Sequence, residues 1–291
     1  MLDVGNNALT AASAPTLARL LASDNARAHL RELSVYMNEL RDDGVGALAE
    51  RLAGCSALRV LDLGGNEVTS RGAGALAAML MGGRRPSNSG RSGTGAGAGG
   101  GFGGGYGGGG GGGTNKGGAG AGAEPLHPPP LALSLRTLEL GYNPLGPEGV
   151  AAIAGAFQTA DARLEALKLG WCKAGGGGGA AALADLLLLN ASLRVLDLRG
   201  NSLGNEGAVR IARALGSHAN GRLEELDLGY NEVRDDGACA LARALKANAG
   251  SAPGEIRMAQ NYVTRFGQVA LQEAVDMVFE LGEGRRTSVQ F

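Results

Sequence analysis

The chain has 291 residues, a formal net charge of −1 and only 4% aromatic residues. A chain of this length forms one or two domains with a buried core, and its balanced charge lacks the basic excess of a protein that binds nucleic acid or an anionic membrane surface. Its apolar runs are also shorter than the roughly 18 residues that a membrane-spanning helix needs. The sequence therefore predicts a protein with no nucleic-acid partner and no membrane association.

Cysteine usage and the first residues indicate the compartment. Cys55, Cys172 and Cys239 are widely spaced, form no CxxC pair and have no histidine beside them. This spacing is typical of free thiols in a reducing compartment, not of disulfides or a metal site. The opening residues MLDVGNN lack the pattern of a secretory signal. We therefore expect a cytoplasmic protein, with the nucleus left open, that holds no metal and no cofactor.

An internal repeat runs along the chain. Its pattern is LxxLxLxxNxLxxxGxxxLAxxL, as in the segment from Leu58 to Leu80. Counted at the Asn position, successive copies are 28 to 31 residues apart, except for one step of 77 residues. The five clear copies have, at this position, Asn38, Asn66, Asn143, Asn201 and Asn231. Three degenerate copies have Asn7, Cys172 and Asn261.

Each copy predicts one strand and one helix. The LxL core alternates with the period of a strand, and the following GxxxLAxxL has the period of an amphipathic helix. Such a unit cannot bury its apolar face alone, so neighbouring units must stack into a solenoid with a parallel sheet on one side and helices on the other. The Asn at the end of each strand is expected to satisfy backbone groups of the adjoining loops, and Cys172 to do so more weakly.

The long step between two copies contains an insertion. Repeats 1–3 occupy residues 1–80, a Gly- and Pro-rich insertion residues 81–130, repeats 4–8 residues 131–282, and a flexible tail residues 283–291. The insertion has low complexity and little apolar surface to bury, so it is predicted to be disordered. A tolerated expansion of a surface loop is favoured over weak RNA binding through its aromatic residues. The run Gly175 to Gly179 is predicted to be a loosened loop, not an anion site, because no Lys, Ser or Thr follows it.

The repeat pattern resembles the ribonuclease-inhibitor-like class of leucine-rich repeats over nearly the whole chain outside the insertion. This class includes ribonuclease inhibitor, the repeat domains of NOD-like receptors and Ran GTPase-activating protein. The resemblance implies an α/β leucine-rich repeat solenoid, or horseshoe, of about eight repeats, with the parallel sheet on the concave face and the helices on the convex face. Because the first strand begins at Met1 or Leu2 without a polar capping element, we expect repeats to be missing upstream.

The candidate binding residues lie in two columns of the concave face. The residue between the two strand leucines is acidic in five of eight copies, and the residue before the Asn position is aromatic in three. Exposed rings beside carboxylates suit a basic protein surface. We therefore predict a partner-binding site made of Tyr142, Trp171, Tyr230, Glu139, Lys168, Asp197 and Asp227. The alternative is that the rings only pack on one another and that the charges are only solvated.

A second set of acidic residues follows the strands, close to the expected helix N-termini. We expect these acids to stabilise the helix dipoles, in preference to a binding role, and they are Asp42, Asp43, Glu148, Glu206, Asp235 and Asp236.

No catalytic residue is predicted, because none of the three histidines lies beside a Cys or Ser with an orienting acid. The favoured interpretation is a non-enzymatic scaffold that binds a protein partner, either a basic protein or a small GTPase, and takes no small-molecule substrate. The resemblance to Ran GTPase-activating protein implies an alternative, an activator of a Ran-like small GTPase. The tail LGEGRRTSVQF departs from the acidic tail of that family, and three cysteines depart from the cysteine-rich ribonuclease inhibitors.

Overall fold

The computed structural model describes residues 1–82, 131–159, 161–217, 221–282 and 286–291, all within one compact unit of the chain. The insertion predicted at 81–130, together with its expected disorder, lies outside these residues apart from Met81 and Gly82.

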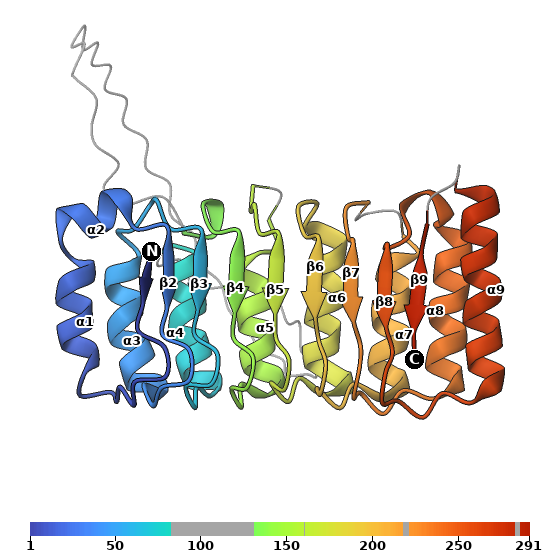
Figure 1. Cartoon of the computed structure of the whole chain (residues 1–291), viewed down its shortest axis with the longest axis horizontal. Helices are drawn as coiled ribbons and strands as arrows, with labels where there is room; N and C mark the ends of the chain where they lie inside the picture. Colours follow the sequence, from blue (N-terminus) through green and yellow to red (C-terminus); the bar gives the residue numbers. More distant parts are fainter. Residues whose placement is uncertain (83–130, 160, 218–220, 283–285) are drawn as a thin grey trace, which may run out of the picture. The chain divides into compact units, whose positions relative to one another are not determined.

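Nine short strands in the described residues form one sheet, in which all strands are parallel and follow one another in chain order (Figure 1). Neighbouring strands pair with their central apolar residues in register, as Leu138 pairs with Leu167. This register follows from the repeat, because each unit places the same leucine at the same height. The strands are β1 (Leu2–Asp3), β2 (Glu32–Ser34), β3 (Val60–Asp62), β4 (Thr137–Glu139), β5 (Ala166–Lys168), β6 (Val195–Asp197), β7 (Glu225–Asp227), β8 (Glu255–Arg257) and β9 (Ser288–Gln290).

Helices cover one face of this sheet and leave the other face open (Figure 1). We call the uncovered side the open face; it corresponds to the concave face of the prediction. The helices are α1 (Ala14–Leu21), α2 (Asp24–His29), α3 (Arg41–Leu52), α4 (Ser70–Leu80), α5 (Gly146–Ala156), α6 (Ala180–Leu189), α7 (Gly204–Leu215), α8 (Asp235–Ala247) and α9 (Arg265–Leu281). None of the described helices has both the length and the apolar character needed to span a lipid bilayer.

The core lies between the sheet and the helices and repeats with the sequence pattern. In the fourth repeat, Leu138 and Leu140 of the strand segment and Ile153 of α5 are fully buried, and the other repeats bury the equivalent positions. Burial of these side chains is the main term that holds successive units together. The predicted α/β solenoid, with a parallel sheet on one side and helices on the other, is confirmed.

Two segments differ from the prediction. The tail, expected to be flexible, contains β9, in which Val289 pairs with Ile256 of β8 and packs against the core. The Thr287 hydroxyl, itself buried, donates to the Pro253 carbonyl at 2.8 Å. Residues 288–290 form a strand because the inward-facing valine fits the repeat and β8 otherwise has an unpaired edge. The Gly175–Gly179 run, predicted to be a loosened loop, is an irregular helical turn that is kinked at Gly177 (φ −90°, ψ −109°) and leads into α6.

Candidate functional site on the open face of the sheet

Buried asparagines organise the loops at the carboxyl ends of the strands. The Asn143 amide is fully buried, and its Nδ2 donates to the backbone oxygens of Leu63 and Leu140, both at 2.9 Å. Its Oδ1 accepts from the N–H groups of Asn66 (2.9 Å) and Val68 (3.0 Å). Each such side chain joins its own loop to that of the preceding repeat, which confirms the expected backbone role. We call these residues the ladder asparagines: Asn38, Asn66, Asn143, Asn201, Asn231 and Asn261.

Cys172 replaces the ladder asparagine in the fifth repeat. Its Sγ donates to the Leu140 carbonyl at 3.2 Å, and its own N–H donates to Asn201 Oδ1 at 3.1 Å. Burial raises the pKa of the Cys172 thiol to about 12, against the opposing effect of the Asn143 N–H. The thiol is therefore protonated at neutral pH. It acts as a hydrogen-bond donor in the ladder and not as a nucleophile. All three cysteines are free thiols, as their spacing predicts.

The residue before each ladder position has a left-handed backbone. The φ angle is 61° at Tyr142, 61° at Trp171 and 56° at Tyr230, a conformation that large side chains seldom adopt. Such a residue costs on the order of 1 kcal/mol and persists where its surroundings impose the conformation. Here the ladder hydrogen bonds fix the loop on either side. The ladder therefore fixes the backbone that carries the three aromatic side chains.

The three rings form one continuous group, which we call the aromatic cluster: Tyr142, Trp171 and Tyr230. The Tyr142 and Trp171 rings stack with centroids 6.4 Å apart and planes 14° apart, and Trp171 meets Tyr230 at 5.4 Å with planes 46° apart. Trp171 reaches across a whole repeat because Gly200 lies between; a Cβ at Gly200 would overlap the indole. The rings remain 55%, 40% and 50% exposed, so mutual packing has not removed them from the surface.

Three of the four charged residues predicted beside the cluster are held in ion pairs. Lys168 forms an ion pair with Glu139, its partner in the register of β4 and β5. Asp197 is 8% exposed and forms an ion pair with Arg199 at 2.9 Å. Burial raises the pKa of Asp197, and the adjacent Arg199 opposes that shift. Asp227 accepts a hydrogen bond from the Gly229 N–H at 2.9 Å and forms no ion pair with a described residue.

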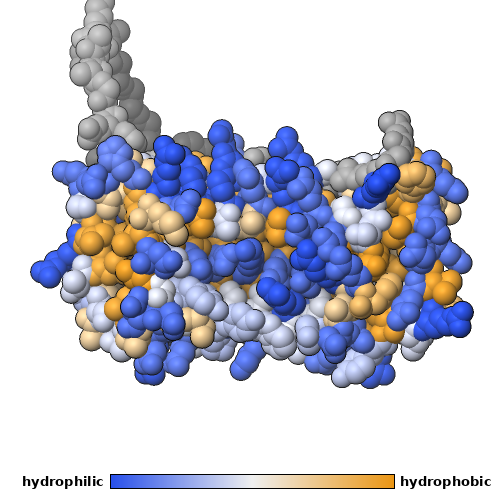
Figure 2. Space-filling model, viewed as in Figure 1, coloured by the Kyte–Doolittle hydropathy of each residue, from blue (hydrophilic) through white to orange (hydrophobic). Residues whose placement is uncertain are grey.

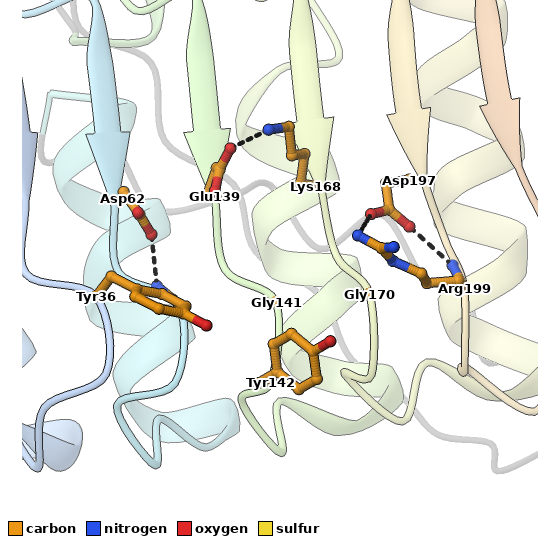
Figure 3. A pocket seen from close by; sticks show the side chains of 10 residues that line it. Tyr36, Asp62, Glu139, Gly141, Tyr142, Lys168, Gly170, Asp197 and Arg199 are labelled. Atoms are coloured by element: carbon orange, nitrogen blue, oxygen red, sulfur yellow. Dashed lines mark hydrogen bonds and ion pairs between the residues drawn. The ribbon is translucent and has the colours of Figure 1, made fainter. Parts of the chain in front are cut away.

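A hollow of about 390 Å³ opens on the same face beside the aromatic cluster (Figure 3). In the view of Figure 3, the charged side chains of β3 to β6 lie along its upper side and Tyr142 lies along its lower side; the charged residues are Asp62, Glu139, Lys168 and Asp197. Figure 2 shows that hydrophilic colour predominates over these middle strands, while apolar colour gathers toward the two ends of the face. The lining residues are Tyr36, Asp62, Gly64, Glu139, Gly141, Tyr142, Lys168, Gly170, Asp197 and Arg199.

Comparisons with known proteins agree with this architecture. The family described as Leucine Rich repeat matches residues 28–49, 54–77, 133–154, 189–212 and 222–242. Ribonuclease inhibitor of Mus musculus is 39% identical over 82 residues, which are 28% of this chain and 18% of the inhibitor. The chain carries leucine-rich repeats similar to those of ribonuclease inhibitor.

A second relative is the NACHT, LRR and PYD domains-containing protein 12 of Mus musculus, which is 36% identical to this leucine-rich repeat protein over 82 residues. Those residues are 28% of this chain and 8% of the relative. The chain thus matches less than a fifth of the length of either curated relative. A solved internalin of Listeria monocytogenes has a TM-score of 0.44 and 13% identity, with 90% of this chain and 54% of the internalin covered.

Several lining residues of the hollow were not among the predicted site residues. The position two residues before the Asn slot reads Tyr36, Gly64, Gly141, Gly170 and Arg199 in consecutive repeats. A run of glycines between a tyrosine and an arginine is the signal that marks a recess in this leucine-rich repeat face. Among the described residues, no group of three or more His, Cys, Asp or Glu side chains is placed to hold a metal ion.

Two of the acids near the helix N-termini, Asp42 and Asp235, link consecutive repeats. Asp42 Oδ1 accepts from the N–H groups of Thr69 (2.8 Å) and Gly72 (3.0 Å), and its Oδ2 accepts from the Thr69 hydroxyl at 2.6 Å. Burial raises the pKa of Asp42, but hydrogen bonds from Thr69, Arg71 and Gly72 outweigh burial, and the net pKa is lowered. Asp42 therefore has the structural role expected of it. Asp235 holds Thr264 in the same way, with distances of 2.8 and 2.6 Å.

Removing this link should lower stability in a pH-dependent manner. We expect Asp42→Ala to lower the free energy of unfolding by about 1 kcal/mol at pH 7, as for loss of a helix cap. Because the folded-state pKa of Asp42 is lowered, the carboxylate's contribution is present above its unfolded pKa and is lost as pH falls through the folded pKa. Urea unfolding at pH 7 and at stepwise lower pH should show that the difference in free energy of unfolding between the wild type and Asp42→Ala becomes smaller as the pH falls.

Asp42→Asn is the matched control. In α7, Asn205 Oδ1 accepts from the N–H groups of Arg234 (2.8 Å) and Gly237 (3.2 Å), so an amide already performs the same task in this protein. Asp42→Asn should cost less than Asp42→Ala at pH 7. Equal losses in the two variants, or a deficit that does not change with pH, would contradict the assignment.

Proposed function

We propose that this leucine-rich repeat protein is a scaffold that binds a protein partner on the open face of its sheet. The observation that carries the proposal is the aromatic cluster, three large rings that contact one another and yet stay half exposed. Exposed rings of this size are typical anchors of protein interfaces. Since the rings already pack together, little side-chain entropy is lost when a partner covers them. The repeats and the two mouse relatives support an interaction role in general terms.

The charges around the cluster favour a basic partner. Asp62 and Asp227 form no ion pair with a described residue, whereas Lys168 and Arg199 are each held by a carboxylate. A basic surface would form ion pairs with these two carboxylates. Among the residues that lie between the two strand leucines from β3 to β7, it would meet no unpaired cation. We propose a cytoplasmic or nuclear location, in keeping with the free thiols, and no catalytic role, small-molecule substrate, nucleic-acid partner or membrane association.

A substitution at the centre of the cluster tests the scaffold. Trp171→Ala should weaken partner binding by about 2 kcal/mol or more, which is roughly a 30-fold change in Kd. Partners are captured from native lysate by the wild type, identified, and their affinity for each variant is measured with purified components. Phe266→Ala is the control, because Phe266 is 70% exposed at the start of α9 and lies outside the cluster. Unchanged affinity for Trp171→Ala would remove the cluster from the interface.

The alternative activity, acceleration of GTP hydrolysis by a Ran-like GTPase, has no comparable support. The resemblance implies that an activator of that kind needs a suitably placed Asn and Arg on a polar rim, whereas the ladder asparagines are occupied by backbone groups and Arg199 is held by Asp197. Single-turnover GTP hydrolysis by such a GTPase at saturating protein tests this activity directly, and acceleration would displace the scaffold proposal in its favour.

A further inference from the structure

The hollow on the open face is bounded by residues from five consecutive repeats. Its floor contains Gly141 and Gly170; a Cβ at Gly141 would lie 3.2 Å from the Gly170 carbonyl oxygen. At one end the Tyr36 ring lies beside Gly64, where a Cβ would be 3.0 Å from a ring carbon. At the other end the Arg199 side chain lies over Gly170, 3.2 Å from a Cβ there. The absence of side chains along the floor therefore forms the recess seen in Figure 3.

Two ion pairs lie in the lining of the hollow, and one carboxylate is outside both of them. Lys168 is paired with Glu139, and Arg199 is paired with Asp197 at 2.9 Å. Asp62 has no ion pair with a described residue. Its oxygens accept from the Gly64 N–H at 2.9 Å and the Ser34 hydroxyl at 3.3 Å. The recess thus presents a net negative charge at Asp62.

Two tyrosine rings border the same space. Tyr36 is 40% exposed and Tyr142 is 55% exposed, and both line the hollow together with Asp62 (Figure 3). A ring face attracts a cation, and a planar guanidinium both lies flat on a ring and donates two N–H groups to a carboxylate. An anion is disfavoured here, because both lining cations already have carboxylate partners.

We propose that the hollow binds an arginine side chain of the partner protein, with the guanidinium paired to Asp62 and lying against the rings of Tyr36 and Tyr142. This inference rests on the proposed function and extends it. Burial and the neighbouring Glu139 raise the pKa of Asp62, against the opposing effects of the Gly64 N–H, the Ser34 hydroxyl and the Lys168 charge. Tyr142 belongs both to the hollow and to the aromatic cluster, so one partner segment along the sheet contacts both.

The test uses the full chain and a small probe. N-acetyl-arginine methylamide is titrated while the backbone amide signals of Gly64, Gly141 and Gly170 are followed by NMR, and the uncharged citrulline analogue is titrated in parallel. The arginine probe should shift these signals saturably and the citrulline probe should not. Equal shifts with both probes, or none well into the millimolar range, would overturn the inference.

Two isosteric variants test whether the Asp62 carboxylate provides the charge that binds the arginine probe. Asp62→Asn should weaken the arginine probe about fivefold, as expected for loss of an ion pair at a partly exposed site. Asp227→Asn is the matched control, because Asp227 accepts from the backbone N–H two residues on at 2.9 Å, as Asp62 does, but lies outside the hollow. Equal weakening by the two variants would overturn the assignment to Asp62. Urea unfolding establishes that both variants retain the fold.

The same variants separate this inference from the scaffold proposal. If Trp171→Ala loses the partner while Asp62→Asn binds it as the wild type does, the scaffold stands and the arginine site falls. If Asp62→Asn weakens the arginine probe while Trp171→Ala binds the partner normally, the arginine site stands and the interface does not include the cluster.

Discussion

Asn201→Ala should lower the free energy of unfolding by about 4 kcal/mol, because the amide is fully buried and hydrogen-bonds to backbone groups of two repeats. Its Nδ2 donates to the carbonyls of Leu169 (2.7 Å) and Leu198 (2.9 Å). Its Oδ1 accepts from the N–H groups of Cys172 (3.1 Å) and Ala174 (3.0 Å). Alanine leaves these four groups without this partner and away from water. Equilibrium unfolding in urea measures the loss.

Two further variants serve as comparisons for Asn201→Ala. Leu189→Ala removes a side chain that is 54% exposed, and it should change stability far less. Cys172→Asn places an amide in the one described ladder position between Asn38 and Asn261 that lacks it, and should raise stability by about 1 kcal/mol, since an amide oxygen is a stronger acceptor than sulfur. A loss for Asn201→Ala no larger than that for Leu189→Ala would show that the ladder does not hold the repeats together.

Gly176→Ala should lower the free energy of unfolding by about 3 kcal/mol. A Cβ at Gly176 would overlap the backbone oxygen of Leu203, at the start of α7, and lie 3.4 Å from the Gly207 nitrogen. Backbone atoms cannot move aside as a flexible side chain can, so the glycine turn and the next repeat must separate. Thermal and urea unfolding of the purified variant measure the effect.

Gly178 provides the control in the same turn. A Cβ at Gly178 meets no atom within 4 Å. Gly178→Ala should therefore be neutral or stabilise by roughly 0.5–1 kcal/mol, because alanine has less conformational freedom to lose on folding. If Gly176→Ala and Gly178→Ala have the same stability, close approach of the backbone is not the reason for glycine at Gly176.

The repeat frame made most of the fold predictable. The strands, the helices, the parallel order and the ladder at Asn143 all follow from local periodicity, because one unit repeats the same alternation and the same buried leucines. Prediction was wrong where the pattern becomes short or degenerate. The three residues of β9 carry too little periodicity to be recognised as a strand, and the Gly175–Gly179 run has no side chains from which to infer a helix.

The candidate site was only partly predictable. The column positions placed Tyr142, Trp171 and Tyr230 on one face. The contact between Trp171 and Tyr230, however, depends on the empty space above Gly200, which lies in the repeat between them and is far from both rings in sequence. Likewise, the acidic column suggested free charge, whereas the tertiary structure pairs Asp197 with Arg199 and nearly buries it. Such pairings depend on side-chain rotamers and on the distance between repeats.

The class of fold and the columns of residues that share the open face follow from spacing along one unit, so they could be predicted from the repeat pattern. Three features could not: which charges neutralise one another, that Asp62 is outside the ion pairs, and that glycines from three repeats line up as the floor of a recess. These features are contacts between units. Their geometry is set by how the repeats stack, which no single repeat encodes.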